Sequence, residues 1–250
     1  MAFLIVYFRN GTTLVERMRA AQPCDEVILW DGTRISHPPE RGGLLEAVVE
    51  LWLERAYTAG FYRPGDGDVI IDAGANVGLF AIQMARQNRR CRVIAMEPFA
   101  ENFNYLQANV ARACPQNVTC REVALGAEFS QGKMQAVGSR SLDHVLRIES
   151  GCTNGIPVIP LAGLFDLAGA QEIDFLKVDI EGSERAVFAA ASSDLLTRFK
   201  RIAMEYHDQI VPDTLDLLRR VLCTTHEIVV RPSKMAGCGI LLAGRRDIGK

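Results

Sequence analysis

Residues 69–85 read VIIDAGANVGLFAIQMA, and this stretch decides which fold the chain can adopt. Three apolar residues lead into Asp72, a turn of small residues follows, and apolar residues at helical spacing begin near Val77. Glycine at positions 74 and 78 allows a tight turn and the close approach of a ligand to the backbone. The pattern predicts a strand, a glycine turn and a helix arranged around a cofactor.

The spacing of these glycines selects among cofactors. A dinucleotide-binding turn follows G-x-G-x-x-G and places its second glycine against a pyrophosphate. Here the spacing is G-x-x-x-G, and the carboxylate of Asp72 directly before the turn would repel a pyrophosphate and attract a cationic amino acid. The next strand ends in Glu97, and an acid at that place commonly accepts hydrogen bonds from ribose hydroxyls. The two acids indicate a nucleoside joined to an amino acid, as in S-adenosylmethionine (SAM).

Strand-like and helix-like segments alternate through the rest of the chain, which predicts a mostly parallel sheet with helices on both faces. Two closing strands are joined by a loop too short for a helix, so they must pair antiparallel. Strands are expected at residues 92–97, 118–125, 174–180, 201–207, 227–231 and 239–244, and helices at 102–113, 161–169, 184–196 and 212–222. Residues 126–155 have weaker periodicity, and residues 134–160 are expected to form a loop over the active-site mouth, where substrate recognition would vary.

The first 60 residues are expected to form a lead-in that covers part of the substrate and cofactor site, and residues 61–250 the catalytic domain. An Asp-Gly turn at residues 31–32 predicts a hairpin, and residues 43–60 have helical spacing. The apolar run in residues 1–10 is too short for a membrane helix, lacks the features of a signal peptide, and is expected to form a strand.

Composition excludes some classes of partner. A formal net charge of -2 on 250 residues, without long basic runs, argues against general binding to the phosphate backbone of nucleic acid. Seven scattered cysteines without a CxxC pair indicate reduced thiols in a cytoplasmic protein, and no segment predicts membrane insertion. We therefore expect a small-molecule partner, and the sequence leaves open whether the chain forms a homo-oligomer.

Four segments taken together resemble the FkbM family of SAM-dependent methyltransferases. They are, in chain order, VIIDAGANVGLFAIQMA, VIAMEPFAENFNYLQANV, EVALGAEFSQGKM and DFLKVDIEGSERAVF, and the resemblance covers about residues 26–207. It implies a Rossmann-like class I methyltransferase fold, of the α/β class, with a mostly parallel seven-stranded sheet and a C-terminal antiparallel hairpin. It also implies SAM as cofactor and methylation of hydroxyl groups on small molecules such as sugars and natural products.

The resemblance also assigns cofactor roles by position. Residues of the glycine turn would surround the methionine part of SAM, Glu97 would hold the ribose, and the residues after it would border the adenosine. The implied set is Asp72, Gly74, Asn76, Gly78, Glu97, Pro98, Phe99, Asn102, Glu122 and Val123, with Asp179 contributing from a neighbouring strand.

The transfer chemistry is expected at the carboxyl ends of two later strands, because functional groups gather there in parallel sheets. Alternation places Asp179 with Glu181, if that strand continues so far, and Glu205 with His207. Asp179, Glu205 and His207 would then face one crevice. His207 is a candidate general base for a hydroxyl acceptor, and the same three residues are candidate ligands of Mg²⁺ or Mn²⁺.

Nearby residues have simpler interpretations. Lys177 is expected to pair with the acids, Glu184 to face solvent or cap a helix, and Tyr57 to be a packed aromatic rather than a lid over the cofactor. His144 is a second candidate base. Three functions compete with O-methylation: N-methylation of a small-molecule amine, a SAM-binding subunit without activity, and an oxidoreductase, which the glycine spacing disfavours.

Overall fold

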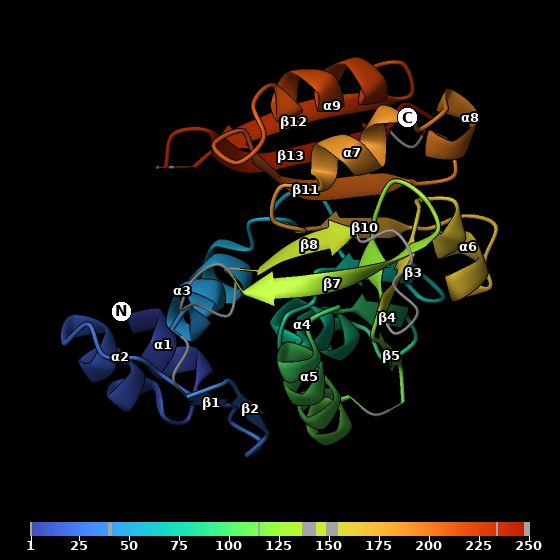
Figure 1. The fold of residues 1–250 in the computed structure, drawn as a ribbon. Coiled ribbons are helices and arrows are strands. Elements are labelled where there is room, and N and C mark those ends of the chain that lie inside the picture. The colour runs from blue at the N-terminus through green and yellow to red at the C-terminus, as the bar shows by residue number, and fades with distance from the viewer. Residues whose placement is uncertain are drawn as a thin grey trace.

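The centre of the fold is a seven-stranded sheet in the order β12-β13-β11-β10-β3-β4-β5 (Figure 1). The computed structural model describes residues 2–39, 42–114, 116–136, 144–148, 155–233 and 235–247. Only β13 runs against its neighbours β11 and β12. The strands are β3 (Val69–Ala73), β4 (Arg92–Met96), β5 (Val118–Arg121), β10 (Phe175–Val178), β11 (Arg201–His207), β12 (His226–Pro232) and β13 (Cys238–Arg245). The predicted parallel sheet with a closing antiparallel hairpin is confirmed.

Apolar residues on both faces of the strands explain why helices cover both sides of this sheet. Ile70 belongs to one buried cluster and its neighbour Ile71 to another, because successive side chains of a strand point to opposite faces. The first cluster includes α4 (Leu79–Gln87) and α5 (Ala100–Ala113). The second includes α6 (Gly163–Ala168), α7 (Glu184–Ala189), α8 (Ser193–Leu196) and α9 (Thr214–Leu222), so the single helix predicted over residues 184–196 is two helices.

The strand order reverses between β3 and β10, and this point fixes where a ligand can bind. The chain runs outward from β3 through β4 to β5, then returns to add β10 on the other side of β3. In open α/β sheets ligands bind in the crevice outside the carboxyl ends of the strands at such a switch point. The glycine turn follows β3, and Asp179 follows β10.

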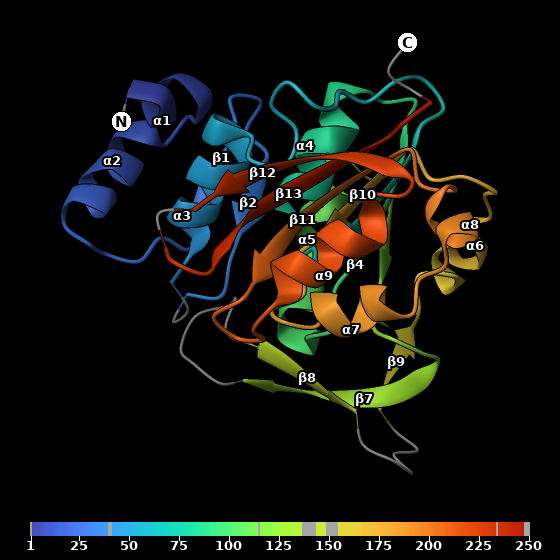
Figure 2. The same cartoon turned by 90° about the horizontal axis from the view of Figure 1, so that it is seen from above.

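The lead-in gathers at the end of the molecule near the tip of the β12–β13 hairpin (Figure 2). It contains α1 (Ala2–Tyr7), α2 (Gly11–Arg19), β1 (Glu26–Ile28), β2 (Arg34–Ser36), α3 (Leu44–Val48) and the π-helical segment η1 (Val49–Glu54). The predicted hairpin is confirmed as β1–β2. The strand predicted at residues 1–10 is wrong: Leu4 and Phe8 are buried while the three residues between them are exposed, which is helical and not alternating burial.

The helix predicted over residues 43–60 ends earlier than expected. Arg55 takes a left-handed conformation at φ 51°, which closes η1. Two bonds fix this segment to α4: the Trp52 indole N–H donates to the carbonyl of Leu79 at 3.3 Å, and the Gln83 amide donates to the carbonyl of Leu51 at 2.9 Å. Lead-in residues share a buried cluster with α4 and α5, and the division at residue 60 stays a prediction.

A second, four-stranded sheet lies outside the central one, as both views of the ribbon show (Figures 1 and 2). Its order is β6-β9-β7-β8, with β6 (Ala124–Leu125), β7 (Ser130–Ala136), β8 (His144–Ile148) and β9 (Ile156–Ile159). The strand predicted over residues 118–125 begins at Val118 as expected but is two strands, because β5 ends at Arg121 and β6 pairs with β9 in the second sheet. The segment 134–160, predicted to be a loop, contains the end of β7 and all of β8 and β9. Its residues 137–143 and 149–154 lie outside the described residues.

Two further findings concern the helices and the cysteines of the described residues. Among the helices that the structure describes, none combines the length and apolar character needed to cross a bilayer. The six cysteines within the described ranges are free thiols, in line with the reduced state expected from the sequence. The cytoplasmic location inferred from these cysteines stays a prediction.

Candidate active site

The glycine turn is locked against the end of β10. Gly74 has φ 79°, and a Cβ atom there would lie 1.7 Å from the carbonyl oxygen of Asp179. Gly78 has φ 92° and opens α4, where a Cβ would lie 2.7 Å from a methyl carbon of Leu106. Gly74 is required by both its conformation and the lack of space beside backbone atoms, and Gly78 is favoured by its positive φ. The turn therefore brings the ends of β3 and β10 into direct backbone contact at the switch point.

Glu97 is held at the end of β4 by two backbone groups. The N–H of Asn76 donates to Oε2 at 2.8 Å, and the N–H of Phe99 donates to Oε1 at 2.9 Å. Burial raises the pKa of this carboxyl to about 7, although the two N–H donors oppose the shift. Each carboxylate oxygen keeps a further lone pair, so Glu97 has a fixed orientation and can still accept hydrogen bonds from ribose hydroxyls.

Asp72 lies beneath the turn and is completely buried. The Nζ atom of Lys177, on the adjacent strand, is 3.1 Å from Oδ1 of Asp72 and 3.5 Å from Oδ2 of Asp179, and it donates to the carbonyl of Gly74 at 2.9 Å. Burial lowers the pKa of Lys177, but the two carboxylates more than offset this and raise it. The predicted pairing of Lys177 with the acids is confirmed, and it ties both strand ends and the turn together.

The remaining predicted cofactor residues lie in different surroundings. Pro98, Phe99 and Asn102 are at the start of α5, next to Glu97, and Asn102 is buried. Glu122 is exposed in the link between β5 and β6, whereas Val123 is buried in the cluster on the α6–α9 face of the sheet. Pro98, Phe99 and Asn102 are therefore close to Glu97 in the chain, whereas Glu122 and Val123 are not.

The three residues predicted to carry the chemistry do converge. Ligand atoms of Asp179, Glu205 and His207 all lie within 4.8 Å of one another, at the carboxyl ends of β10 and β11. The suggestion that the strand continues to Glu181 is wrong, because β10 ends at Val178 and Glu181 has φ 50°. Its carboxylate reaches the cluster all the same, with Oε2 at 3.5 Å from Nε2 of His207.

For Glu184 the expectation of solvent exposure is wrong. It is completely buried rather than exposed, and its Oε1 atom accepts a hydrogen bond from Nδ1 of His207 at 2.9 Å. The bond orients the ring so that Nε2 faces Glu181 and Glu205. The spacing of the acids in D-I-E-G-S-E was the available signal, since a helix that starts directly after a strand end can point its first turn back toward that strand.

Tyr57 joins the lead-in to this cluster. Its side chain is buried, and its hydroxyl lies 3.3 Å from Oδ2 of Asp179 and 3.5 Å from Oε2 of Glu205. The interpretation of Tyr57 as a packed aromatic is therefore correct for the ring, while its hydroxyl contacts two of the predicted catalytic carboxylates. The side chain of His144 lies outside the described residues.

Burial and mutual repulsion shift the pKa values of the cluster. Burial, together with the charge of Asp179, raises the pKa of Glu205 to about 8 and that of Glu50 to about 7. Burial lowers the pKa of His207, but its bond to Glu184 and the surrounding carboxylates outweigh this and raise it to about 9. An imidazole and several carboxylates in one half-buried crevice are a donor set suited to a cation or to proton transfer.

The strand order, the antiparallel last strand and the glycine turn at the switch point define a Rossmann-like class I methyltransferase. Two solved structures have the same fold. One is a proposed rRNA methylase from Clostridium thermocellum, with TM-score 0.52, 10% identity, and coverage of 78% of this chain and 95% of that chain. The other is a chain of a fibrillarin/Nop5p complex, with TM-score 0.51, 11% identity, and coverage of 88% and 97%. Such low identities show the fold alone.

The family follows from residues 72–225, which match the methyltransferase FkbM domain, so the chain belongs to the FkbM methyltransferase family. It is a SAM-dependent methyltransferase, as the glycine turn and the acid after β4 predicted. The match begins at Asp72 and ends beyond His207, and so spans both strand ends that form the site.

Three curated proteins are similar to this chain at identities of 22–27%. The 31-O-demethyl-FK506 methyltransferase FkbM of Streptomyces tacrolimicus is 26% identical over 192 residues, covering 64% of this chain and 73% of the relative. Methyltransferase 1 of Beauveria bassiana is 22% identical over 181 residues, covering 64% and 72%. The AMB antimetabolite synthetase AmbE of Pseudomonas aeruginosa is 27% identical over 199 residues, with coverage of 64% of this chain but only 9% of that much longer protein.

Proposed function

We propose that this methyltransferase transfers the methyl group of SAM to a hydroxyl oxygen of a small molecule. The observation that carries the proposal is the convergence of Asp179, Glu205 and His207 beside the glycine turn. In the reaction the acceptor oxygen forms a bond to the methyl carbon as the carbon–sulfur bond breaks. The hydroxyl proton must leave, and S-adenosylhomocysteine is released.

For the cofactor we propose that the glycine turn holds the methionine part and Glu97 the ribose. The two backbone N–H groups that fix Glu97 support this, because they set its carboxylate before the cofactor arrives. We assign Asp72 a role beneath the turn, where its ion pair with Lys177 holds the ends of β3 and β10 in place. Pro98, Phe99 and Asn102 would border the adenosine, with Glu122 and Val123 at its outer edge.

The cluster also fits a divalent cation, and we propose Mg²⁺ or Mn²⁺ with Asp179, Glu205 and His207 as ligands. Support comes from Glu184, because a histidine that binds a metal commonly donates its other ring N–H to a carboxylate. Such an ion lowers the pKa of a bound hydroxyl. His207 acting directly as general base is the competing role, and in that case His207 has to lose its proton before it can accept one.

Chelation separates these two roles. The enzyme is treated with EDTA, dialysed, and assayed with and without added Mg²⁺ or Mn²⁺. Loss of activity and its recovery on adding the ion support the cation. Unchanged activity after chelation refutes the cation and leaves His207 as the base.

A small-molecule acceptor is favoured over nucleic acid by the charge of the site. Glu50, Glu181, Glu184 and Glu205 surround the candidate catalytic residues, and a phosphate backbone would be repelled there. The Streptomyces relative is named as an O-demethyl-FK506 methyltransferase, which favours oxygen over nitrogen as the acceptor atom.

The direct experiment is a mass-spectrometric screen of hydroxylated metabolites for the gain of one CH₂ group in the presence of SAM. Fragmentation then locates the methyl group. A product methylated on nitrogen would establish the N-methyltransferase alternative. Tight SAM binding without any product across the screen would favour a non-catalytic subunit.

A further inference from the structure

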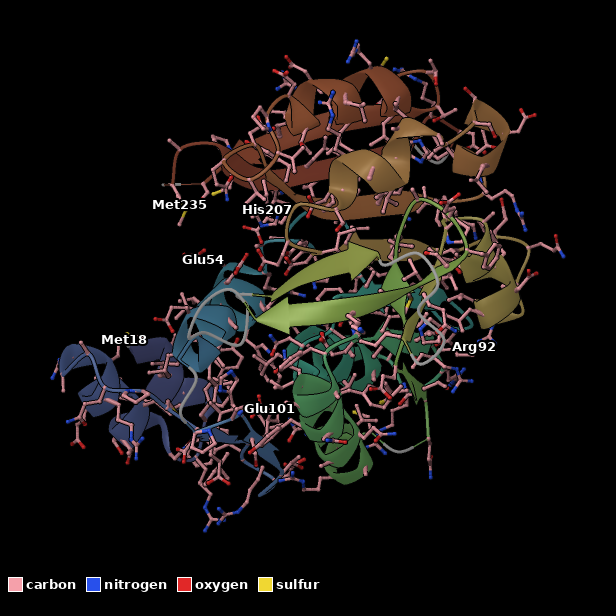
Figure 3. The ribbon with its side chains drawn as sticks, viewed as in Figure 1. Met18, Glu54, Arg92, Glu101, His207 and Met235 are labelled. Atoms are coloured by element: carbon pink, nitrogen blue, oxygen red, sulfur yellow. The ribbon has the colours of Figure 1, made fainter. Side chains whose placement is uncertain are left out.

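A cavity of about 1040 Å³ lies between the lead-in and the tip of the β12–β13 hairpin. Its wall includes Met18 on α2, Glu54 at the end of η1, Pro232 and Ile240 on the hairpin, and Glu205. Figure 3 shows Glu54 at the end of the lead-in helix and His207 at the end of β11, on the same side of the molecule. Through Glu205 the cavity reaches the cluster that is proposed to carry the chemistry.

We propose that this cavity binds the methyl acceptor, and that it selects a molecule with an apolar body and a basic, cationic amine in addition to its hydroxyl. The identification of the bound molecule as the methyl acceptor rests on the proposed function. The preference for an amine follows from the cavity itself and can be measured without any methyl transfer.

The size and apolar part of the wall suit a drug-sized molecule. Binding sites for small ligands commonly have volumes of roughly 300–1,000 Å³, with mostly apolar walls and a few polar groups that fix orientation. The apolar side chains here come from α2, the turn after it, α3, η1 and the hairpin, and are Met18, Pro23, Leu44, Leu45, Val49 and Ile240.

The charged part of the wall is dominated by carboxylates. Glu46, Glu50 and Glu54 are spaced four residues apart along α3 and η1, so they follow one side of the helix and all line the cavity, together with Glu205. Among the described lining residues Arg231 is the one cation, and its guanidinium N–H groups donate to the backbone carbonyls of Ala56 and Ala59.

Four acidic side chains therefore face one guanidinium that is already bonded to neutral groups. Inside a half-enclosed cavity this arrangement attracts a cation and repels an anion more strongly than an open surface would. With Arg231 as the one cation among the described lining residues, these acidic side chains lack a matching positive charge. An ammonium group beside Glu50 and Glu54 would supply that charge and would leave the hydroxyl end of the acceptor free to approach Glu205.

Three probes of the same length test the preference: 8-amino-1-octanol, 1,8-octanediol and 8-hydroxyoctanoate. Their binding to the full chain is measured by calorimetry at low salt in EDTA, so that no divalent ion competes. We expect the amine to bind about tenfold more tightly than the diol, since a charge-assisted hydrogen bond is worth more than a neutral one, and the carboxylate to bind most weakly. Equal affinities of amine and diol would overturn the proposal.

Variants of the cavity-wall glutamates test where the ammonium group of the probe binds. Glu54→Gln is expected to lower amine affinity about threefold, and Glu46→Gln/Glu54→Gln about tenfold, with diol affinity unchanged. Both side chains are exposed, so folding should be retained. Glu227→Gln, on β12 and 78% exposed at its side chain, makes the same change of charge away from the cavity and should have no effect. Equal effects of the Glu54 and Glu227 variants would contradict the assignment.

SAM titration keeps this result separate from the proposed function. If the amine binds as expected but SAM does not, the cavity preference stands and the methyl-transfer function fails. If SAM binds and the amine has no advantage, the methyl-transfer function stands and the cavity preference fails.

Discussion

Nδ1 of His207 lies 2.9 Å from Oε1 of Glu184, a carboxylate without solvent exposure. Because a carboxylate only accepts, the proton of this hydrogen bond belongs to Nδ1 of the histidine. The ring is thereby held with Nε2 toward Glu181 and Glu205. A residue on the first turn of α7 thus sets the orientation of the imidazole at the end of β11.

Replacing Glu184 tests this positioning role. Glu184→Gln keeps a hydrogen-bond acceptor but removes the charge, and we expect turnover to fall about 10- to 100-fold, the range found when a carboxylate behind a ligating histidine is lost. SAM affinity should stay unchanged, because Glu184 lies on the α7 side of the cluster. Glu172→Gln, at an exposed ion pair, is the matched control. Wild-type turnover in Glu184→Gln would show that the bond is structural only.

Tyr57 gives a second test of the site. In Tyr57→Phe the ring still packs, but Asp179 and Glu205 lose the hydroxyl that lies between them. We expect about a fivefold or greater fall in kcat with a loss of only about 1 kcal/mol in the free energy of unfolding. The control is Tyr62→Phe, which removes a hydroxyl bonded to Asp68 at 2.7 Å and should alter stability but not kcat. Equal kcat in both variants would remove Tyr57 from the reaction.

Gly74 tests the contact between the turn and β10. An alanine there would place its Cβ 1.7 Å from the carbonyl oxygen of Asp179, and backbone overlap cannot be relieved by a rotamer change. We expect Gly74→Ala to lose about 3 kcal/mol or more of unfolding free energy and to lose SAM binding. Gly169→Ala has a similar positive φ of 57° but meets open space, so it should lose only about 1 kcal/mol. Denaturant unfolding measures both, and similar losses would refute the overlap argument.

The buried ring of His226 is expected to make the free energy of unfolding depend on pH. The ring is buried, Nε2 donates to the carbonyl of Phe199 at 3.0 Å, and the Thr225 hydroxyl can donate to Nδ1 at 2.8 Å. Burial lowers the pKa of His226 below its usual 6.5, so the unfolded state binds the proton more readily. Its contribution is therefore present above pH 6.5 and is lost as the pH falls toward the lowered folded value.

Urea unfolding at several pH values checks this contribution. Between pH 6.5 and 5 the wild type should lose up to about 1.4 kcal/mol per pH unit more than His226→Gln, which has no proton to bind. Parallel stability curves for the two proteins would contradict the assignment of His226 as a buried neutral side chain.

The sequence predicted the parts of the fold that depend on local patterning. Short apolar runs lead to Asp72 in β3 and to Glu205 in β11, as expected for buried parallel strands. The closing strands are too near each other to pair in any direction but antiparallel. Convergence of Asp179, Glu205 and His207 followed from strand alternation and from the common edge of parallel strand ends.

Features set by distant contacts could not be predicted. The apolar run at the N-terminus forms a helix because Leu4 and Phe8 are buried against other residues of the lead-in. The local sequence pattern does not indicate this burial. Glu184 was misplaced because burying an acid is unfavourable unless a partner is present, and that partner, His207, is 23 residues away. The contacts of Tyr57 with Asp179 and Glu205 span more than 100 residues.

The most direct test of the account is a calorimetric titration of SAM into the wild type and Glu97→Gln, with Glu128→Gln, an exposed position, as the control. Glu97 is fixed by two backbone N–H groups at the end of β4, so losing its charge should weaken SAM binding about tenfold or more, while the control binds as the wild type does. NAD should not bind to any of the three proteins. Binding of NAD in place of SAM, or equal SAM affinity in all three, would contradict the assignment of this crevice as the SAM site.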